Sequence, residues 1–291
     1  MAQSKSIKYY AGKQILIIGG SSGLGLSVAK YAKSRGAIVT ITSRSLSKIS
    51  PLKREYNILS VDITNEGSVS ALPTNYDIII CCAGYACPSY ARDITIKETQ
   101  SHLDCNFLGA VRVYLHFLKS VSAKSRKQLV FVASTLALRS FGGYGMYAPS
   151  KSALSSFYES VRTESSIHGL DLCIYYVSTI QSPGFEIEQE HKPLFTKKIE
   201  GSSLGADSIP ASRAKTLLDA LPTEEIIYSD FITCLFSKSS DINSFQDFLA
   251  WMASPFFWMI FKMFESHTVK KYYEHTSETP KKNKLLKKKK K

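Results

Sequence analysis

The sequence predicts an α/β fold, a doubly wound parallel sheet with helices on both faces, in a single domain. Three observations predict it. Short apolar runs of buried-strand type alternate along the chain with helix-like segments. The first apolar run passes directly into a glycine-rich turn and then into a helical pattern. The 291 residues, of which 44% are hydrophobic, suffice for one sizeable core.

The predicted strands can be followed in chain order. They read QILII at 14–18, AIVTITS at 37–43, ILSV at 58–61, DIIICC at 77–82, QLVFVAS at 128–134, LDLCIYYVS at 170–178 and EEIIYSDF at 224–231. Helix-like segments separate them. Because ligands of such sheets bind outside the carboxyl ends of the strands, we expect the site at that edge, within a domain spanning residues 1–240.

A glycine-rich turn, GGSSGLG, follows the first predicted strand. Glycine allows a tight turn and a close approach to a pyrophosphate, and the next helix presents its N–H groups and positive dipole end. The spacing is Gly19-x3-Gly23-x-Gly25, which differs from the commoner GxGxxG. Alone it could be a plain turn. Between a strand and a helix it predicts a nucleotide site formed by Gly19, Ser21, Ser22, Gly23 and Gly25.

The second strand ends in a basic and hydroxyl-bearing tip, Thr42-Ser43-Arg44-Ser45, with Lys48 nearby and no acid. An acid would repel a ribose 2′-phosphate, whereas Arg44, Lys48 and hydroxyl groups attract one. This tip predicts NADPH rather than NADH, with a surface arginine in a turn as the alternative.

Two further positions belong to the predicted cofactor site. Asp62 ends the third strand and is expected either to hold the adenine amino group or to cap the helix in TNEGSV. Gly84 follows the fourth strand, where a small residue lets the backbone lie against the cofactor.

The stretch STLALRSFGGYGMYAPSK, residues 134–151, is the candidate catalytic segment. Tyr147 and Lys151 are four positions apart and share one face of a helix that begins nearby. A phenol beside an ammonium forms a proton donor and acceptor that works near neutral pH. Pro149 is tolerated because it falls in the first helical turn. The polar, Pro/Gly-punctuated residues 178–201 predict a mobile lid over the substrate.

The C-terminal part differs from the rest. Residues 245–264 hold both tryptophans and six phenylalanines, interrupted by Asp247, Pro255 and Lys262. We expect membrane association, either as one crossing, as an interfacial helix or as a kinked re-entrant pair; a core or dimer helix is the soluble alternative. In the basic tail, 265–291, the last twelve residues contain eight lysines and no acid. Such a run is a solvated tail, or it contacts anionic lipid or nucleic acid.

Other classes of site find little support. The six cysteines show no paired spacing of the zinc-site kind, and we expect free thiols in a reducing compartment. The six histidines are scattered, so no metal is expected. The N-terminus has no apolar signal-peptide core, which argues against secretion.

Taken together, these motifs resemble the short-chain dehydrogenase/reductase family. The residues that carry the resemblance are Gly19-x3-Gly23-x-Gly25, CCAG at 81–84, Asn106, Ser134 and Tyr147-x3-Lys151, in the family's order. The resemblance covers about residues 12–235 and implies a Rossmann-type fold. Three positions depart from the family pattern: Ile18 before the first glycine, Cys82 in place of the usual Asn, and Val177-Ser178 in place of Pro-Gly.

The resemblance also implies a role for each matched residue. Tyr147 donates a proton to a ketone oxygen while NADPH delivers hydride to the carbon. Lys151 holds the nicotinamide ribose and lowers the pKa of Tyr147. Ser134 polarises the carbonyl, and Asn106 positions a water that supplies protons to Lys151. The glycines cradle the pyrophosphate, and Arg44 binds the 2′-phosphate.

Within the family, the strings SRS, CCAG, GYGMYAPSK and SPGFEIEQ are similar to the fungal 3-ketodihydrosphingosine reductase branch. This implies NADPH-dependent reduction of 3-ketodihydrosphingosine to dihydrosphingosine, at the endoplasmic reticulum membrane with the site facing the cytosol. The implied partners are a long-chain lipid ketone and membrane lipids, without nucleic acid, and a homo-oligomer is left open. The alternatives are another lipid ketone, such as a steroid or acyl-dihydroxyacetone phosphate, or a non-catalytic nucleotide-binding membrane scaffold.

Overall fold

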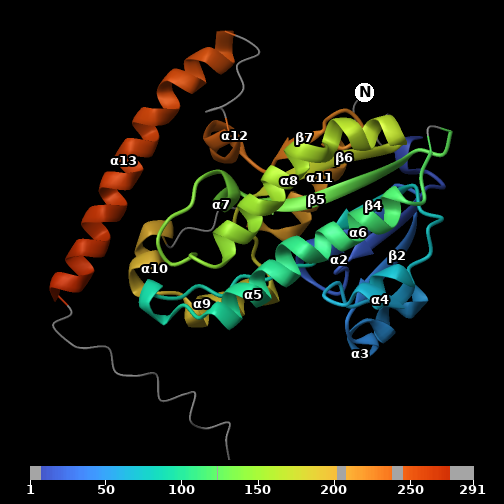
Figure 1. Cartoon of the computed structure of the whole chain (residues 1–291), viewed down its shortest axis with the longest axis horizontal. Coiled ribbons are helices and arrows are strands. Elements are labelled where there is room, and N and C mark those ends of the chain that lie inside the picture. Colours follow the sequence, from blue (N-terminus) through green and yellow to red (C-terminus); the bar gives the residue numbers. More distant parts are fainter. Residues whose placement is uncertain (1–7, 123, 202–207, 238–244, 276–291) are drawn as a thin grey trace, which may run out of the picture.

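The computed structural model describes residues 8–122, 124–201, 208–237 and 245–275. Its centre is a seven-stranded sheet in the order β3-β2-β1-β4-β5-β6-β7, and every neighbouring pair is parallel (Figure 1). The strands are β1 Gln14–Ile18, β2 Ile38–Ser43, β3 Asn57–Ser60, β4 Ile78–Cys81, β5 Lys127–Ser134, β6 Leu170–Val177 and β7 Ile226–Tyr228. The predicted doubly wound parallel sheet is confirmed.

Helices cover both faces of this sheet. In chain order they are α2 Gly23–Ser34, α3 Leu46–Ile49, η1 Ser50–Arg54, α4 Glu66–Ser70, η2 Ala91–Asp93, α5 Ile96–Leu103, η3 Asp104–Leu108, α6 Gly109–Leu118, α7 Thr135–Leu138, α8 Tyr147–His168, α9 Pro183–His191, α10 Leu194–Glu200, α11 Pro210–Ala220, α12 Phe231–Ser237 and α13 Phe245–His275. The strands carry near-continuous apolar side chains because both of their faces are buried.

The alternation of side chains along β1 shows the two layers. Ile15 and Ile17 pack with α2 and α11 on one face, and Leu16 and Ile18 pack with α4, α6 and α8 on the other. After β1 the chain winds to β2 and β3, and it then crosses to β4 on the other side of β1. The strand order therefore reverses between β1 and β4, and a crevice at that point suits a ligand.

The segment predicted to be a lid is largely helical. Residues 183–200 form two helices, α9 and α10, joined at Lys192 and Pro193. Ser182 caps α9, accepting a hydrogen bond from the N–H of Phe185 at 3.2 Å, and Pro183 occupies the first turn. The serine and proline at 182–183 thus act as a helix start signal.

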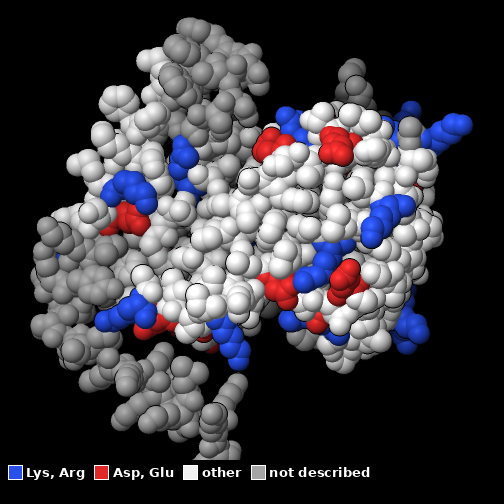
Figure 2. Space-filling model, in the orientation of Figure 1, with Lys and Arg blue, Asp and Glu red and all other residues white. Residues whose placement is uncertain are grey.

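The C-terminal hydrophobic stretch forms one helix, α13, which continues past Phe264 to His275 and contains Pro255. Figure 1 shows it as a long rod beside the sheet domain, where it contacts α10 and α12. Figure 2 shows the charged side chains of the described residues in the same orientation. No helix among the described residues is long and apolar enough to cross a membrane. The lysine-rich end, residues 276–291, lies outside the described part of the chain.

Candidate active site

The predicted site residues converge at the carboxyl edge of the sheet. The glycine-rich turn, 19–25, leaves β1 and enters α2, and the segment 82–85 leaves β4. Ser134 ends β5, and Tyr147 begins α8, which packs on β5 and β6. Because β1, β4 and β5 are neighbours in the sheet, these segments lie side by side.

The glycine-rich turn lies close against the end of β2 and the segment that follows β4. Gly19 has a φ of +81°, which glycine adopts without a steric penalty. A Cβ at Gly19 would lie 2.8 Å from the backbone of Ala83, and one at Gly25 would collide with the carbonyl oxygen of Gly19. The Gly19 N–H donates to Oγ1 of Thr42 at 3.2 Å. Gly19 and Gly25 are therefore required by the packing of the turn.

The N-terminus of α2 is open to an anion. Ser22 is the N-cap, its side chain makes no capping hydrogen bond, and the first turn holds no acidic residue. The first N–H groups and the positive dipole end are thus not compensated by a local carboxylate, and this suits a phosphate. The lid begins over the same turn, since a Cβ at Gly23 would lie 3.2 Å from the Cβ of Ser182.

Arg44 is exposed directly after β2, as predicted. Hydrogen bonds from the side chain and backbone of Thr64 lower the pKa of Asp62, and the charge of Arg44 acts in the same direction. The Thr64 N–H and hydroxyl donate to Oδ1 of Asp62 at 3.0 and 2.7 Å, whereas Asn65 caps α4. The helix-cap alternative for Asp62 is therefore wrong. The side chain of Lys48 lies outside the described residues.

Asn106 lies buried in the π-helical turn η3 and joins two parts of the site. Its Oδ1 accepts from the Tyr85 N–H at 2.9 Å, and its Nδ2 donates to the Tyr85 carbonyl at 2.9 Å and to Oγ of Ser150 at 3.0 Å. A Cβ at Gly84 would lie 3.0 Å from Oδ1 of Asn106 and 3.4 Å from Nζ of Lys151. The amide thus holds the segment after β4 against α8. Its role in positioning a water stays a prediction.

Lys151 is buried in α8, and its Nζ donates to the carbonyl of Val132 in β5 at 2.8 Å. Burial lowers its pKa to about 8, while nearby cysteines, chiefly Cys105, act in the opposite direction. The ammonium is therefore held next to Gly84, close to the point between β1 and β4 where the strand order reverses.

Ser134 and Tyr147 are brought together across the loop that separates them in sequence. The Ser134 Oγ accepts from the Leu136 N–H at 3.2 Å and lies near the phenol of Tyr147. Burial raises the pKa of Tyr147 to about 12, although the nearby Ser134 hydroxyl lowers it; the charge of Glu188 raises it further. The predicted lowering of the pKa of Tyr147 is therefore wrong for this structure. At neutral pH the phenol holds its proton.

A buried polar cluster, absent from the predictions, joins the lid to the loop before Tyr147. The side chain of Lys192 is fully buried, and its Nζ lies 2.9 Å from Oε1 of Glu188 and 2.5 Å from Oε2 of Glu200. The hydroxyl of Tyr144 lies 2.6 Å from Glu188 and 2.5 Å from Glu200. The rings of Tyr144 and Tyr147 have centroids 6.0 Å apart. Helices α9 and α10 thus contact the ring next to the candidate proton donor.

The departure at Val177-Ser178 has a structural basis. The Ser178 N–H donates to Oγ of Ser229 at 3.0 Å, and its hydroxyl donates to Asp230 at 2.6 Å. The buried Arg213 donates to the same hydroxyl at 2.7 Å. This network, rather than a Pro-Gly turn, directs the chain from β6 into the lid.

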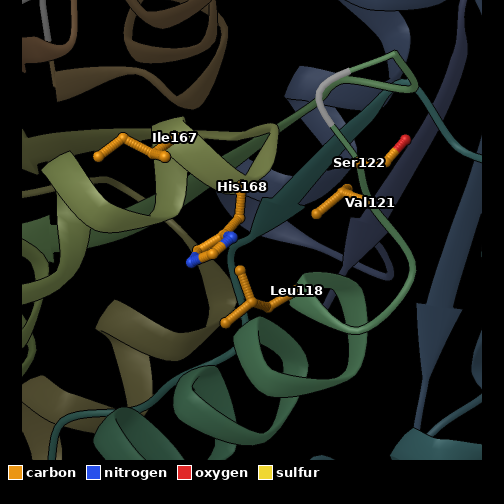
Figure 3. Close-up of a pocket in the computed structure, with 5 residues that line it drawn as sticks. All are labelled: Leu118, Val121, Ser122, Ile167 and His168. Atoms are coloured by element: carbon orange, nitrogen blue, oxygen red, sulfur yellow. The ribbon is translucent and has the colours of Figure 1, made fainter.

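Other side chains bear on the remaining predictions. The six cysteines are free thiols, as predicted. A hollow of about 550 Å³ is lined by Leu118, Val121, Ser122, Ile167 and His168. Figure 3 shows how these five residues lie. These residues end α6 and α8 or follow α6, so the hollow lies at the amino edge of the sheet, opposite the converging residues. Among the described residues, no group of His, Cys, Asp and Glu is placed to hold a metal ion.

The chain is similar to known proteins in sequence and in fold. The profile of the short chain dehydrogenase family matches residues 13–191. A PIGF/3-ketodihydrosphingosine reductase fusion protein of Schizosaccharomyces pombe is 31% identical over 71% of this chain and 46% of its own length. A 3-ketodihydrosphingosine reductase of Saccharomyces cerevisiae is 28% identical over 82% of this chain and 80% of its own.

The chain thus spans about half the length of the first of these relatives. A solved short chain dehydrogenase of Burkholderia cenocepacia, in complex with NADP, has a TM-score of 0.67 at 17% identity, covering 79% of this chain and 93% of that one. At that identity the likeness shows the fold.

Proposed function

The chain belongs to the short chain dehydrogenase family, and within it we propose that the protein reduces 3-ketodihydrosphingosine to dihydrosphingosine with NADPH. The observation that carries the proposal is the meeting of Ser134, Tyr147 and Lys151 beside an open glycine-rich turn. The names of the relatives from Schizosaccharomyces pombe and Saccharomyces cerevisiae support the choice of substrate.

The cofactor proposal rests on two parts of the site. The packing of Gly19 against Ala83 and the uncapped N-terminus of α2 form a cradle that fits a pyrophosphate. Arg44, exposed after β2, would hold the ribose 2′-phosphate. NADPH, when bound, supplies the hydride that the ketone carbon accepts.

Tyr147 is the proposed proton donor. With a pKa raised to about 12, it is protonated at neutral pH and able to protonate the ketone oxygen as the carbon accepts hydride. The Ser134 hydroxyl, which lies near the phenol of Tyr147, is placed to donate to the same oxygen and to stabilise its developing negative charge. The product is an alcohol, and the phenolate left on Tyr147 regains its proton from solvent.

Lys151 and Asn106 complete the proposed machinery. The ammonium of Lys151 is placed to hold the nicotinamide ribose and to stabilise the phenolate formed in the reaction. The hydrogen bonds of Asn106 to Tyr85 and Ser150 hold the walls of this pocket together. Delivery of protons through a water at Asn106 is part of the proposal.

We also propose that α13 lies in the interface of the endoplasmic reticulum membrane, with the site on the cytosolic side. Leu249, Met252, Phe256, Ile260 and Met263 are each at least half exposed and repeat at helical spacing, so they share one face of α13. An apolar face of this kind suits lipid, and a substrate with a long alkyl chain would partition there.

The direct test supplies the purified full-length protein with NADPH and 3-ketodihydrosphingosine in lipid vesicles, and measures dihydrosphingosine by mass spectrometry. We expect stoichiometric NADPH consumption and product formation, absent in Tyr147→Phe. A steroid ketone and acyl-dihydroxyacetone phosphate are assayed in parallel. Faster turnover of either would replace the proposed substrate, and no turnover of any ketone would favour the scaffold alternative.

A further inference from the structure

Helix α13 has a second face that is directed at the protein. Trp258, Phe261, Glu265 and Thr268 lie at helical spacing on the side opposite Phe256, and each is buried or half-buried. Glu265 is the buried charged residue of this face, with 9% of its surface exposed. A carboxylate is rarely buried to this extent unless its oxygens have partners.

The partner of Glu265 is the loop that leads to Tyr147. Its Oε1 accepts a hydrogen bond from the backbone N–H of Gly142 at 2.6 Å. Its Oε2 accepts from Nζ of Lys262 at 2.7 Å, and that ammonium also reaches the carbonyl of Ser140 at 3.3 Å. Hydrogen bonds to an ionised acceptor are short and strong, so this contact fixes the loop more firmly than a neutral one would.

Aromatic contacts extend the same junction. The rings of Phe141 and Phe261 have centroids 5.6 Å apart, and the Arg139 guanidinium lies 5.5 Å from the ring centroid of Trp258. Residues 139–142 are therefore held by α13 through both charge and packing.

The loop has little freedom on its other sides. The Thr196 hydroxyl of α10 donates to the carbonyl of Gly142 at 3.0 Å, and the Ser89 N–H donates to the carbonyl of Gly143 at 2.9 Å. Gly143 has a φ of +101°, and a Cβ there would collide with Thr196. The backbone carbonyl of the next residue, Tyr144, accepts a hydrogen bond from the N–H of Ala148 at 2.9 Å. The loop therefore leads directly into the first turn of α8.

We propose that Glu265 is a positioning residue: by binding the Gly142 N–H, it holds the loop 139–146 in the shape that places Tyr147 and Tyr144 at the site. Helix α13 then does more than attach the protein to a surface. Its outer face offers apolar side chains, and its inner face sets the geometry of the catalytic loop. The inference rests on the proposed function for its catalytic readout, whereas its structural readout needs no substrate.

The test uses the full-length protein with two variants and a control. Glu265→Ala removes the acceptor, Glu265→Gln keeps an acceptor oxygen of similar reach, and Ser266→Ala changes an exposed neighbour. Hydrogen–deuterium exchange is followed in peptides over 139–146, with the β5 strand as internal reference. We expect the fastest exchange of the loop in Glu265→Ala, a smaller increase in Glu265→Gln because its amide oxygen is a weaker, neutral acceptor, and no change in Ser266→Ala or in β5.

The kinetic readout separates positioning from anchoring. In Glu265→Ala, kcat for the ketone should fall on the order of 10- to 100-fold, because misplacement of a catalytic group by an ångström costs about that much. The KM for NADPH and binding to lipid vesicles should stay near the wild-type values, and Glu265→Gln should recover most of kcat. Unchanged exchange over 139–146 in Glu265→Ala would overturn the proposal, whatever the substrate proves to be. Equal loss of kcat in the two variants would overturn it as well.

Discussion

Lys192 and Glu200 form a buried ion pair, with Nζ donating to Oε2 at 2.5 Å. Glu188 lies 2.9 Å from the same ammonium, so one lysine forms ion pairs with two carboxylates. These carboxylates also hold the hydroxyl of Tyr144, three residues before Tyr147. The packing of α9 and α10 on Tyr144 thus depends on a cation whose side chain is wholly buried.

Replacement of Lys192 by methionine should destabilise the protein strongly. The change leaves the charges of Glu188 and Glu200 without their counter-ion, and breaking a buried pair typically costs about 3–5 kcal/mol. Lys215→Met is the matched control, because Lys215 is 57% exposed and its bond to Asp219 is worth at most about 1 kcal/mol. Urea unfolding measures both free energies. Similar small losses in the two variants would show that the Lys192 cluster contributes little.

The parts of the site that follow from local spacing could be predicted from the sequence. Gly19 and Gly25 lie in one turn between a strand and a helix, and Tyr147 and Lys151 lie on one helix. The two glycines meet because they belong to one turn, and Tyr147 and Lys151 share a face because of the helical period. The seven strands were recognisable because parallel strands buried on both faces are apolar throughout.

Contacts between distant segments could not be predicted in this way. Gly142 and Glu265 are separated by 123 positions, and no repeat or motif connects them. The pair Glu188–Lys192 has the i, i+4 spacing of an ordinary exposed pair, and only the packing of α9 on Tyr144 buries it. The pKa of Tyr147 was misjudged because the effect of burial depends on the surrounding fold, which sequence spacing does not reveal.

Replacement of Tyr147 by phenylalanine should lower kcat by about 10²- to 10⁴-fold, since it removes the proton donor and keeps the ring. The affinity for NADPH, measured by fluorescence titration, should change little. Tyr158→Phe removes a hydroxyl of the same helix that makes one long bond to Glu225, at 3.3 Å, and should leave kcat near the wild-type value. Near-normal turnover in Tyr147→Phe would remove this residue from the mechanism.

The pH dependence of kcat/KM should follow the protonation state of Lys151. A lysine is charged below its pKa, and burial lowers that of Lys151 to about 8, so the charged fraction falls as the pH rises past this value. The kcat/KM of the free enzyme should decline there, whereas Tyr147, with a pKa of about 12, stays protonated.

Lys151→Arg is the control, because a guanidinium keeps its charge to above about pH 12. Whatever activity this variant retains should not decline between about pH 7 and pH 10. A wild-type profile that is flat over the same range would mean that the charge of Lys151 is not needed.

Arg44→Asp should reverse the cofactor preference. The change removes a cation from the proposed 2′-phosphate site and places a carboxylate there, which repels the phosphate. Loss of one charge-assisted hydrogen bond, about 1.5–3 kcal/mol, corresponds to a roughly 10- to 100-fold drop in kcat/KM for NADPH. Arg54→Asp, at an exposed position of η1, controls for the change in net charge. An unchanged ratio of kcat/KM for NADPH and NADH in Arg44→Asp would place the 2′-phosphate elsewhere.

The exposed apolar face of α13, which includes Phe256 and Met263, should determine how strongly the protein binds membranes. Phe256 and Met263, which are 66% and 65% exposed, lie two turns apart on this face, and replacing both by serine removes two large apolar groups. If each contributes about 1.5 kcal/mol when buried in lipid, the partition coefficient should fall on the order of 100-fold. Sedimentation with anionic vesicles measures it, and Ile167→Ser, at a 71% exposed site on α8, is the control. If vesicle binding stays intact but the mass in solution falls to that of a monomer, the outer face is a contact between two copies of the chain, because an apolar face is buried equally well by lipid or by its own counterpart.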